Sequence, residues 1–153
     1  MKSTALLLSL FLLASCASEP REGVAYAAER NPADRAAANA AGMIGKPYRY
    51  GGASPTGFDC SGLIQFSYKQ AGVSLPRDTT DQRRATQRVK LAEVQPGDLI
   101  FFDQRGRKNS HVGIYLGERR FVHAPSSGKH VRNDSLDNPY WKKHLSEVRR
   151  PSA

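Results

Sequence analysis

The sequence predicts a domain of the α+β class, in which helices come first and an antiparallel sheet follows. Residues 31–72 carry helical spacing and helix-capping residues, whereas residues 98–150 carry short runs rich in Val, Ile, Phe and Tyr. Segregated helices and strands, rather than alternating ones, are typical of this class. The chain of 153 residues is long enough for one such domain, which we assign to residues 31–153.

Three helices are expected in the first half of the domain. Asn31, followed by a proline, has the composition of an N-cap, and alanines at helical spacing continue to a stop at Gly45. A glycine-rich loop then precedes a second helix that starts near Cys60 and closes at Gly72. A short third helix is expected to start at Asp78.

The second half of the domain predicts a sheet of about five strands. The expected strands are residues 98–102, 111–116, 120–124, 129–132 and 146–150. A turn at Gly117 joins the second and third of them as a hairpin. Asn138, followed by a proline, is expected to begin one helical turn inside the irregular segment 134–144.

The first residues have the composition of an export signal: a positive Lys2, a short apolar run and small residues before Cys16. Leu-Ala-Ser-Cys at 13–16 resembles the bacterial lipobox. That resemblance implies a signal peptide over residues 1–15, acylation of Cys16 and a lipid-anchored tether over residues 16–30. An ordinary signal peptide with an incidental cysteine is the alternative.

Export determines which partners and which location are expected. An exported lipoprotein is anchored to the membrane facing the cell wall, and Ala17 after the acylated cysteine favours the periplasmic side of the outer membrane in a Gram-negative source. The formal charge of +9 then favours anionic wall and membrane surfaces, and no nucleic acid is expected as a partner. The sequence contains no sign of an oligomer, so a monomer is expected.

Cys60 is the centre of the predicted site. With Cys16 acylated, it is a lone thiol in an oxidising compartment, which indicates a chemical role. The predicted helix start and the base His111 both stabilise a thiolate, so we expect a depressed pKa for Cys60. His111 and His123 meet at one end of the predicted hairpin, where they supply a base and a group that orients it. His130 is expected to be exposed and uninvolved.

Five segments in order resemble the NlpC family of cell-wall cysteine peptidases. They are YRYGGASPTGFDCSGLIQFSY, LPRDT, QPGDLIFF, HVGIYLG and FVHAPSSG, and the resemblance runs from about residue 34 to the end. It implies a papain-like fold that hydrolyses amide bonds of peptidoglycan stem peptides. The bond is expected to join D-glutamate or D-alanine to the diamino acid.

The resemblance also implies a role for six residues. Cys60 matches the nucleophile, His111 the base and His123 the third polar residue. Tyr48 matches a residue on the oxyanion side of the site, and Asp59 and Ser61 match residues that contact the substrate. From the residues alone, Tyr48 equally suits a packing role and Asp59 a helix N-cap.

Three other functions are compatible with parts of the sequence. A Cys-His acyltransferase uses the same thioester chemistry with another nucleophile in place of water. A non-catalytic wall-binding lipoprotein does not need the set of Cys60, His111 and His123. A metal site is disfavoured because neither CxxC nor HxxxH spacing is present, and no metal or cofactor is expected. Since we see no added wall-binding domain, we expect an open cleft that admits polymeric peptidoglycan.

Overall fold

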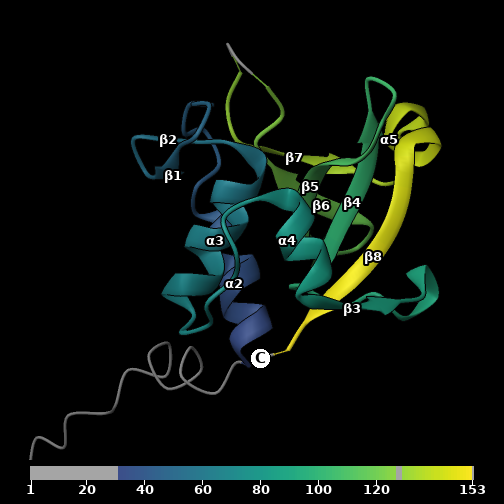
Figure 1. Ribbon diagram of the computed structural model, residues 1–153, viewed down its shortest axis with the longest axis horizontal. Coiled ribbons are helices and arrows are strands. Elements are labelled where there is room, and N and C mark those ends of the chain that lie inside the picture. Colours follow the sequence, from purple (N-terminus) through teal and green to yellow (C-terminus); the bar gives the residue numbers. More distant parts are fainter. Residues whose placement is uncertain (1–30, 127–128, 153) are drawn as a thin grey trace, which may run out of the picture.

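The computed structural model describes residues 31–126 and 129–152, and confirms the α+β class with helices first and an antiparallel sheet second. The first helices of the chain lie to one side and the sheet to the other, while the last helix lies at the far side of the sheet (Figure 1). The helices are α2 (Pro32–Ala41), α3 (Cys60–Gln70), α4 (Thr79–Arg84), the 3-10 turn η1 (Leu91–Glu93) and α5 (Pro139–His144). The predicted signal peptide, Cys16 and tether lie outside the described residues. No helix among the described residues is long and apolar enough to cross a membrane.

Each of the four α-helices in the described part of the chain begins directly after a polar residue whose side chain accepts a hydrogen bond from the first turn. These N-cap residues are Asn31, Asp59, Asp78 and Asn138. The first backbone N–H groups of a helix have no partner inside it, so a side-chain oxygen placed there fixes the start. The predicted starts of these helices are therefore confirmed.

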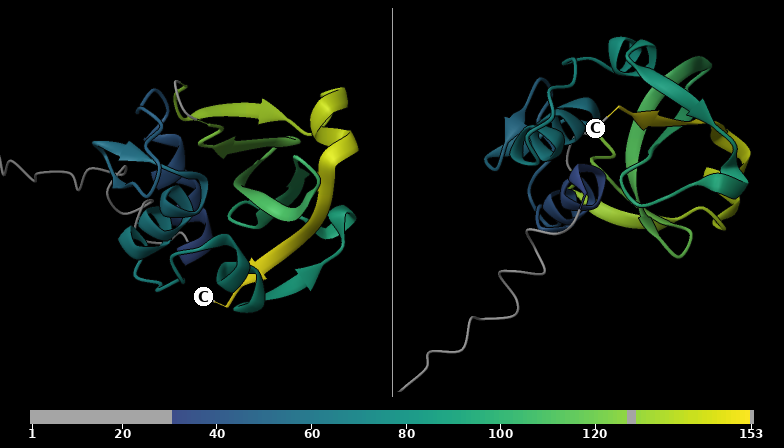
Figure 2. Two further views of the ribbon diagram at one scale, coloured as in Figure 1. Left: turned by 45° about the horizontal axis from the view of Figure 1, so that its top comes forward. Right: turned by 90° about the horizontal axis from the view of Figure 1, so that it is seen from below.

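The main sheet has six strands in the order β3-β8-β4-β5-β6-β7, and all neighbours are antiparallel. Its strands are β3 (Thr86–Val89), β4 (Leu99–Gln104), β5 (Arg107–Gly117), β6 (Arg120–His123), β7 (Arg132–Ser135) and β8 (Leu145–Pro151). Two views show that the sheet is strongly curved (Figure 2). A separate pair, β1 (Ala53–Ser54) and β2 (Gly57–Phe58), braces the loop before α3.

The sequence prediction missed or misplaced three pieces of this sheet. The edge strand β3 (TQRV) was missed because it is short and polar. The strand expected at 129–132 lies further along the chain, as β7 at Arg132–Ser135. Val131 lies before it, and its backbone N–H donates to the carbonyl of Lys46. The loop expected before His111 belongs to β5, where the Asp103 side chain accepts from the backbone N–H of Asn109 at 2.7 Å.

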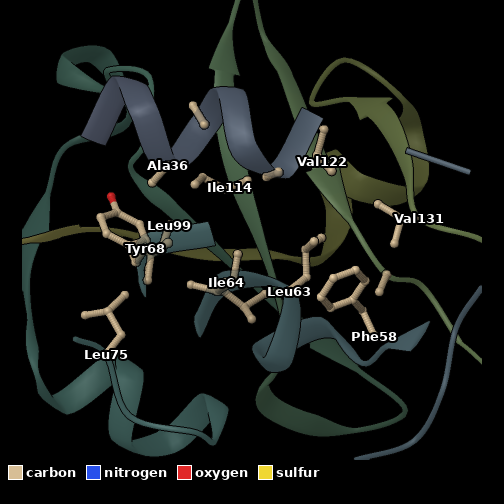
Figure 3. Close-up of a cluster of buried hydrophobic side chains, with 14 of the residues drawn as sticks. Ala36, Phe58, Leu63, Ile64, Tyr68, Leu75, Leu99, Ile114, Val122 and Val131 are labelled. Atoms are coloured by element: carbon tan, nitrogen blue, oxygen red, sulfur yellow. The ribbon is translucent and has the colours of Figure 1, made fainter. Parts of the chain in front are cut away.

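Two hydrophobic clusters cover the two faces of the sheet. Side chains alternate along a strand, so Leu99 and Phe101 join one cluster while Ile100 and Phe102 join the other. The first cluster lies between the helices and the sheet, where α2 and α3 pack (Figure 3). The hydroxyl of Tyr68 also donates to the Gly97 carbonyl at 2.7 Å. That bond ties α3 to the turn before β4, and so fixes the helix that carries Cys60.

Candidate active site

Cys60 is the first residue of α3, and the preceding Asp59 holds that helix start in place. The Asp59 side chain accepts from the backbone N–H of Gly62 at 2.7 Å and from that of Gly51 at 3.0 Å. The N-cap hypothesis for Asp59 is therefore confirmed. The N–H groups of Cys60 and Ser61 remain at the end of the helix dipole, where they favour negative charge on a sulfur or on a substrate oxygen.

Arg77 joins the two residues that flank the cysteine. Its guanidinium donates to the Asp59 carboxylate at 2.6 Å and to the Ser61 hydroxyl at 2.9 Å. The hydrogen bond to Asp59 raises the pKa of Arg77 further, so the arginine stays charged. The loop before α3 and the segment before α4 are thereby locked together. Any substrate contact that Asp59 or Ser61 makes has to be shared with Arg77, whose place in the LPRDT segment favours a structural rather than a catalytic role.

His111 and His123 meet on neighbouring strands, β5 and β6. Nε2 of His111 lies 2.8 Å from Nδ1 of His123, and both side chains are buried. The predicted contact between the two rings is therefore confirmed. It occupies Nε2 of His111, so Nδ1 is the nitrogen of this ring that remains to accept a proton.

Burial keeps both rings uncharged. It lowers the pKa of His111 from 6.5 to about 3, and positive charge on His123 acts in the same direction. Burial also lowers the pKa of His123, although the hydrogen bond that His123 donates to Asp134 opposes it. At neutral pH the site therefore contains two neutral imidazoles, and His111 is available as a base.

Asp134 on β7 continues the chain of contacts, and the sequence analysis missed it. Its carboxylate lies 2.8 Å from Nε2 of His123 and also pairs with Arg132 at 3.0 Å. The residue lies in a polar strand (RNDS) without an apolar pattern. The signal that finds it is the antiparallel register, in which Phe121 pairs with Asp134 and His123 with Arg132. That register puts His123 and Asp134 on one face, as diagonal neighbours.

One cavity of about 560 Å³ brings Cys60, His111 and Tyr48 together. Its other lining residues come from the loop before α3, from the β4–β5 hairpin and from the segment after β6: Tyr50, Gln104, Arg105, Arg107, Ser110, Ala124, Pro125 and Ser126. His123, Asp59 and Ser61 are not among the lining residues. A comparable cavity of about 540 Å³ lies between β3 and β8, and neither cysteine nor histidine lines it.

Tyr48 is placed to act as a hydrogen-bond donor in this cavity. Burial raises the pKa of Tyr48, and negative charge on Cys60 raises it further, so the phenol keeps its proton. A protonated phenol beside a nucleophile suits the oxyanion side of a site. Among the described residues, no group of three or more His, Cys, Asp or Glu is arranged to hold a metal ion.

The thiol of Cys60 does not have the depressed pKa that the sequence predicts. Burial raises its pKa above the ordinary 9.0, and the charge of Asp59 acts in the same direction. The backbone N–H of Val112 and the hydroxyl of Thr79 lower it without cancelling the effect of burial. The helix start was visible in the sequence, but the packing that removes water from the sulfur was not. At rest the site holds a neutral thiol beside a neutral imidazole.

Comparison with known proteins finds a matching family and similar sequences. The NlpC/P60 family profile matches residues 45–150. The chain is similar to the murein DD-endopeptidase MepH of Escherichia coli, with 41% identity over 113 residues, or 71% of this chain and 42% of MepH. It is also similar to the bifunctional muramidase/DL-endopeptidase CwlT of Bacillus subtilis, with 43% identity over 104 residues, or 66% of this chain and 31% of CwlT. The chain therefore spans less than half the length of either relative.

A solved structure supports the fold as well. A Staphylococcus aureus protein described as similar to a lipoprotein of the NLP/P60 family superposes with a TM-score of 0.70 at 39% identity. The match covers 93% of this chain and 45% of that one. The α+β, papain-like arrangement predicted from the sequence is thereby confirmed.

The raised pKa of Cys60 predicts slow, strongly pH-dependent alkylation. With Cys16→Ser, Cys60 is the only cysteine left in the chain, so mass spectrometry with iodoacetamide follows it alone. We expect the alkylation rate to keep rising as the pH passes 9.0, because the folded protein forms the thiolate only there. The same chain unfolded in urea is the control and should show an ordinary thiol, whose alkylation rate levels off at a lower pH. An inflection in the folded protein at a lower pH than in the control would contradict the neutral thiol and indicate a thiolate paired with the protonated imidazole of His111.

Proposed function

The chain belongs to the NlpC/P60 family, and from this premise we propose that it is a cell-wall endopeptidase that hydrolyses an amide bond of peptidoglycan stem peptides. The observation that carries the proposal is the shared cavity of Cys60 and His111, with His123 hydrogen-bonded behind the base. A nucleophile, a base and a group that orients the base are the parts that amide hydrolysis by a thiol requires.

The proposed reaction starts from neutral groups. As the sulfur of Cys60 attacks the carbonyl carbon, Nδ1 of His111 takes the thiol proton, and negative charge moves to the carbonyl oxygen. The N–H groups at the start of α3 and the hydroxyl of Tyr48 donate to that oxygen. When the C–N bond breaks, His111 returns the proton to the leaving amine, which leaves a thioester on Cys60. Water, deprotonated by His111, then cleaves the thioester and releases the acid.

The charge around the cavity supports an anionic polymer as the substrate. Arg105 and Arg107 line the cavity that contains Cys60, and no Asp or Glu of the described residues lines it. Stem peptides carry free carboxylates, which the basic rim formed by Arg105 and Arg107 attracts. MepH is named a DD-endopeptidase and CwlT a DL-endopeptidase. Because the chain is similar to both, two bonds to the diamino acid remain candidates, one from D-alanine and one from D-glutamate. Product analysis decides between them.

We further propose that the protein is an exported lipoprotein anchored through Cys16. The lipobox-like sequence at residues 13–16 supports it, as does the similarity to the Staphylococcus aureus protein described as similar to a lipoprotein. An anchor followed by a short tether keeps the catalytic domain near the wall and raises its local concentration there. In a Gram-negative source, we propose the periplasmic side of the outer membrane.

The first test follows peptide release from intact sacculi by mass spectrometry. We expect the wild type to release stem peptides and Cys60→Ala to release none, since no nucleophile remains. His111→Ala should lower the rate by about 100- to 10,000-fold, the range for loss of a general base. His130→Ala is the matched control, because that side chain is exposed and does not line the cavity, and it should retain full activity.

Three outcomes would contradict the proposal. An active Cys60→Ala protein would remove the nucleophile from the mechanism. Digestion of small free peptides with untouched sacculi would assign the protein to turnover of released fragments. Products that carry a transferred acyl group, without free acid ends, would indicate an acyltransferase.

The next test concerns the positive charge of the basic rim. Arg105→Glu combined with Arg107→Glu should lower kcat/KM on sacculi about tenfold or more at low salt, because the charge beside the cavity is reversed. Arg88→Glu combined with Lys90→Glu makes the same charge change at the other cavity and should change kcat/KM far less. Added salt should reduce the difference, since charges are screened beyond about 10 Å at 0.1 M. Equal effects of the two double variants would leave only the net charge of the protein as the cause.

The third prediction concerns the anchor. Intact-mass analysis of the mature protein should show a chain that begins at Cys16 and carries acyl groups. The protein should fractionate with membranes, and Cys16→Ser should release it. A mature chain with an unmodified Cys16 would contradict the lipoprotein proposal.

A further inference from the structure

We propose that Asp134 is a positioning residue that fixes the protonation pattern of both site histidines, and so leaves Nδ1 of His111 free to take the thiol proton. The catalytic consequence rests on the function proposed above. The protonation pattern itself rests on the hydrogen bonds of the described residues alone.

The protonation pattern follows from the Asp134 carboxylate, which can accept hydrogen bonds but cannot donate one. The Asp134 carboxylate has no proton to give, so Nε2 of His123, 2.8 Å away, must be the donor. A neutral imidazole carries one proton, so Nδ1 of His123 is then an acceptor. Nε2 of His111 lies 2.8 Å from that acceptor and must carry the proton of its own ring. Nδ1 of His111 is left with a lone pair.

Without the carboxylate, the opposite pattern is available. His123 can carry its proton on Nδ1 and donate to Nε2 of His111, and the 2.8 Å contact is satisfied equally well. His111 then carries its own proton on Nδ1 and cannot accept one from Cys60. Either ring can therefore be the donor in this hydrogen bond, and Asp134 determines that His111 donates and His123 accepts.

The charges around Asp134 keep it in the accepting form. Burial works to raise the pKa of Asp134, but the hydrogen bond from His123 and the guanidinium of Arg132 outweigh burial and lower it. Arg132 lies opposite His123 in the β6–β7 pairing and is paired with Asp134 at 3.0 Å. Arg132 therefore orients the carboxylate from its solvent side, while His123 meets it from the inside.

The aromatic surroundings fix where the rings lie but not where their protons lie. Trp141 stacks on His111 with ring centroids 5.7 Å apart and meets His123 edge-on at 4.8 Å. Phe121 lies 5.0 Å from His123, centroid to centroid. These apolar contacts have no preference between the two protonation patterns. Loss of the Asp134 carboxylate should therefore leave the ring positions intact and change the protons.

The test uses the full chain with ¹⁵N-labelled histidine, because ring nitrogen shifts distinguish a protonated from an unprotonated nitrogen. In the wild type we expect both His111 and His123 to be protonated at Nε2. In Asp134→Asn the amide can donate as well as accept, so the opposite pattern should become populated in both rings. Asp134→Ala, which offers neither group, should give the same mixture if the near-isosteric variant does not fold. Asp137→Asn is the matched control, since Asp137 pairs with Arg119 on the exposed turn and not with a histidine.

Activity gives a second readout. Asp134→Asn should lower kcat by about 10- to 100-fold, the scale of losing a group that orients a catalytic one, with little change in KM. Asp134→Glu, which keeps a carboxylate, should recover part of kcat, whereas Asp137→Asn should behave as the wild type. A purely structural role would instead lower the melting temperature and leave the Nε2 protonation unchanged.

The two proposals fail separately. If the wild type shows the Nε2 pattern but releases nothing from sacculi, the function is wrong and the role of Asp134 stands. If the wild type is active while Asp134→Asn keeps both the pattern and kcat, the role of Asp134 is wrong and the function stands. A wild-type His111 protonated at Nδ1 would overturn the inference directly.

Discussion

The 2.8 Å hydrogen bond between His111 and His123 depends on the register of β5 and β6 and on what packs beneath it. Gly113 lies two positions from His111 on the same strand, and a Cβ there would come within 2.6 Å of the ring of Phe121. The missing side chain allows Phe121 to lie against His123 and Trp141. The second hydrophobic cluster thus does more than bury apolar area, since it holds two polar rings at bonding distance inside a sheet.

Burial of Cys60 and His111 determines the electrostatics of the site. Loss of water raises the pKa of Cys60 and lowers that of His111, so the two groups resist forming an ion pair at rest. In the proposed reaction, charge develops only as the thiol attacks, on a substrate oxygen and on the imidazole. The proposal assigns the α3 start and Tyr48 to the oxygen, and the hydrogen bonds place His123 and Asp134 behind the imidazole. Each developing charge thereby meets groups that were placed before the reaction began.

Local signals account for what the sequence predicted well, and long-range pairing for what it did not. The helix starts at Asn31, Asp59 and Asp78 follow from caps, which need only neighbouring residues. The contact of His111 with His123 was accessible because a single tight hairpin joins their strands. Asp134 belongs to the next strand of the sheet, beyond a longer connection, and Arg77 reaches Asp59 across the loop before α4. Neither distance along the chain fixes a register, so Asp134 was missed and the partners of Arg77 were not predicted.

The two networks that flank the nucleophile have the same construction. On one side Asp59 pairs with Arg77, and on the other Asp134 pairs with Arg132. In both pairs the carboxylate is the more buried partner, 15% and 22% exposed, and the arginine the more exposed, at 37% and 46%. Each pair is neutral as a whole, so neither adds net charge beside Cys60. The positive charge beside the cavity comes instead from the arginines of the β4–β5 hairpin, which line it. In the proposed function, attraction of an anionic polymer is thereby separated from the neutral interior in which the thiol and the imidazole exchange a proton. Each of the two can change without disturbing the other.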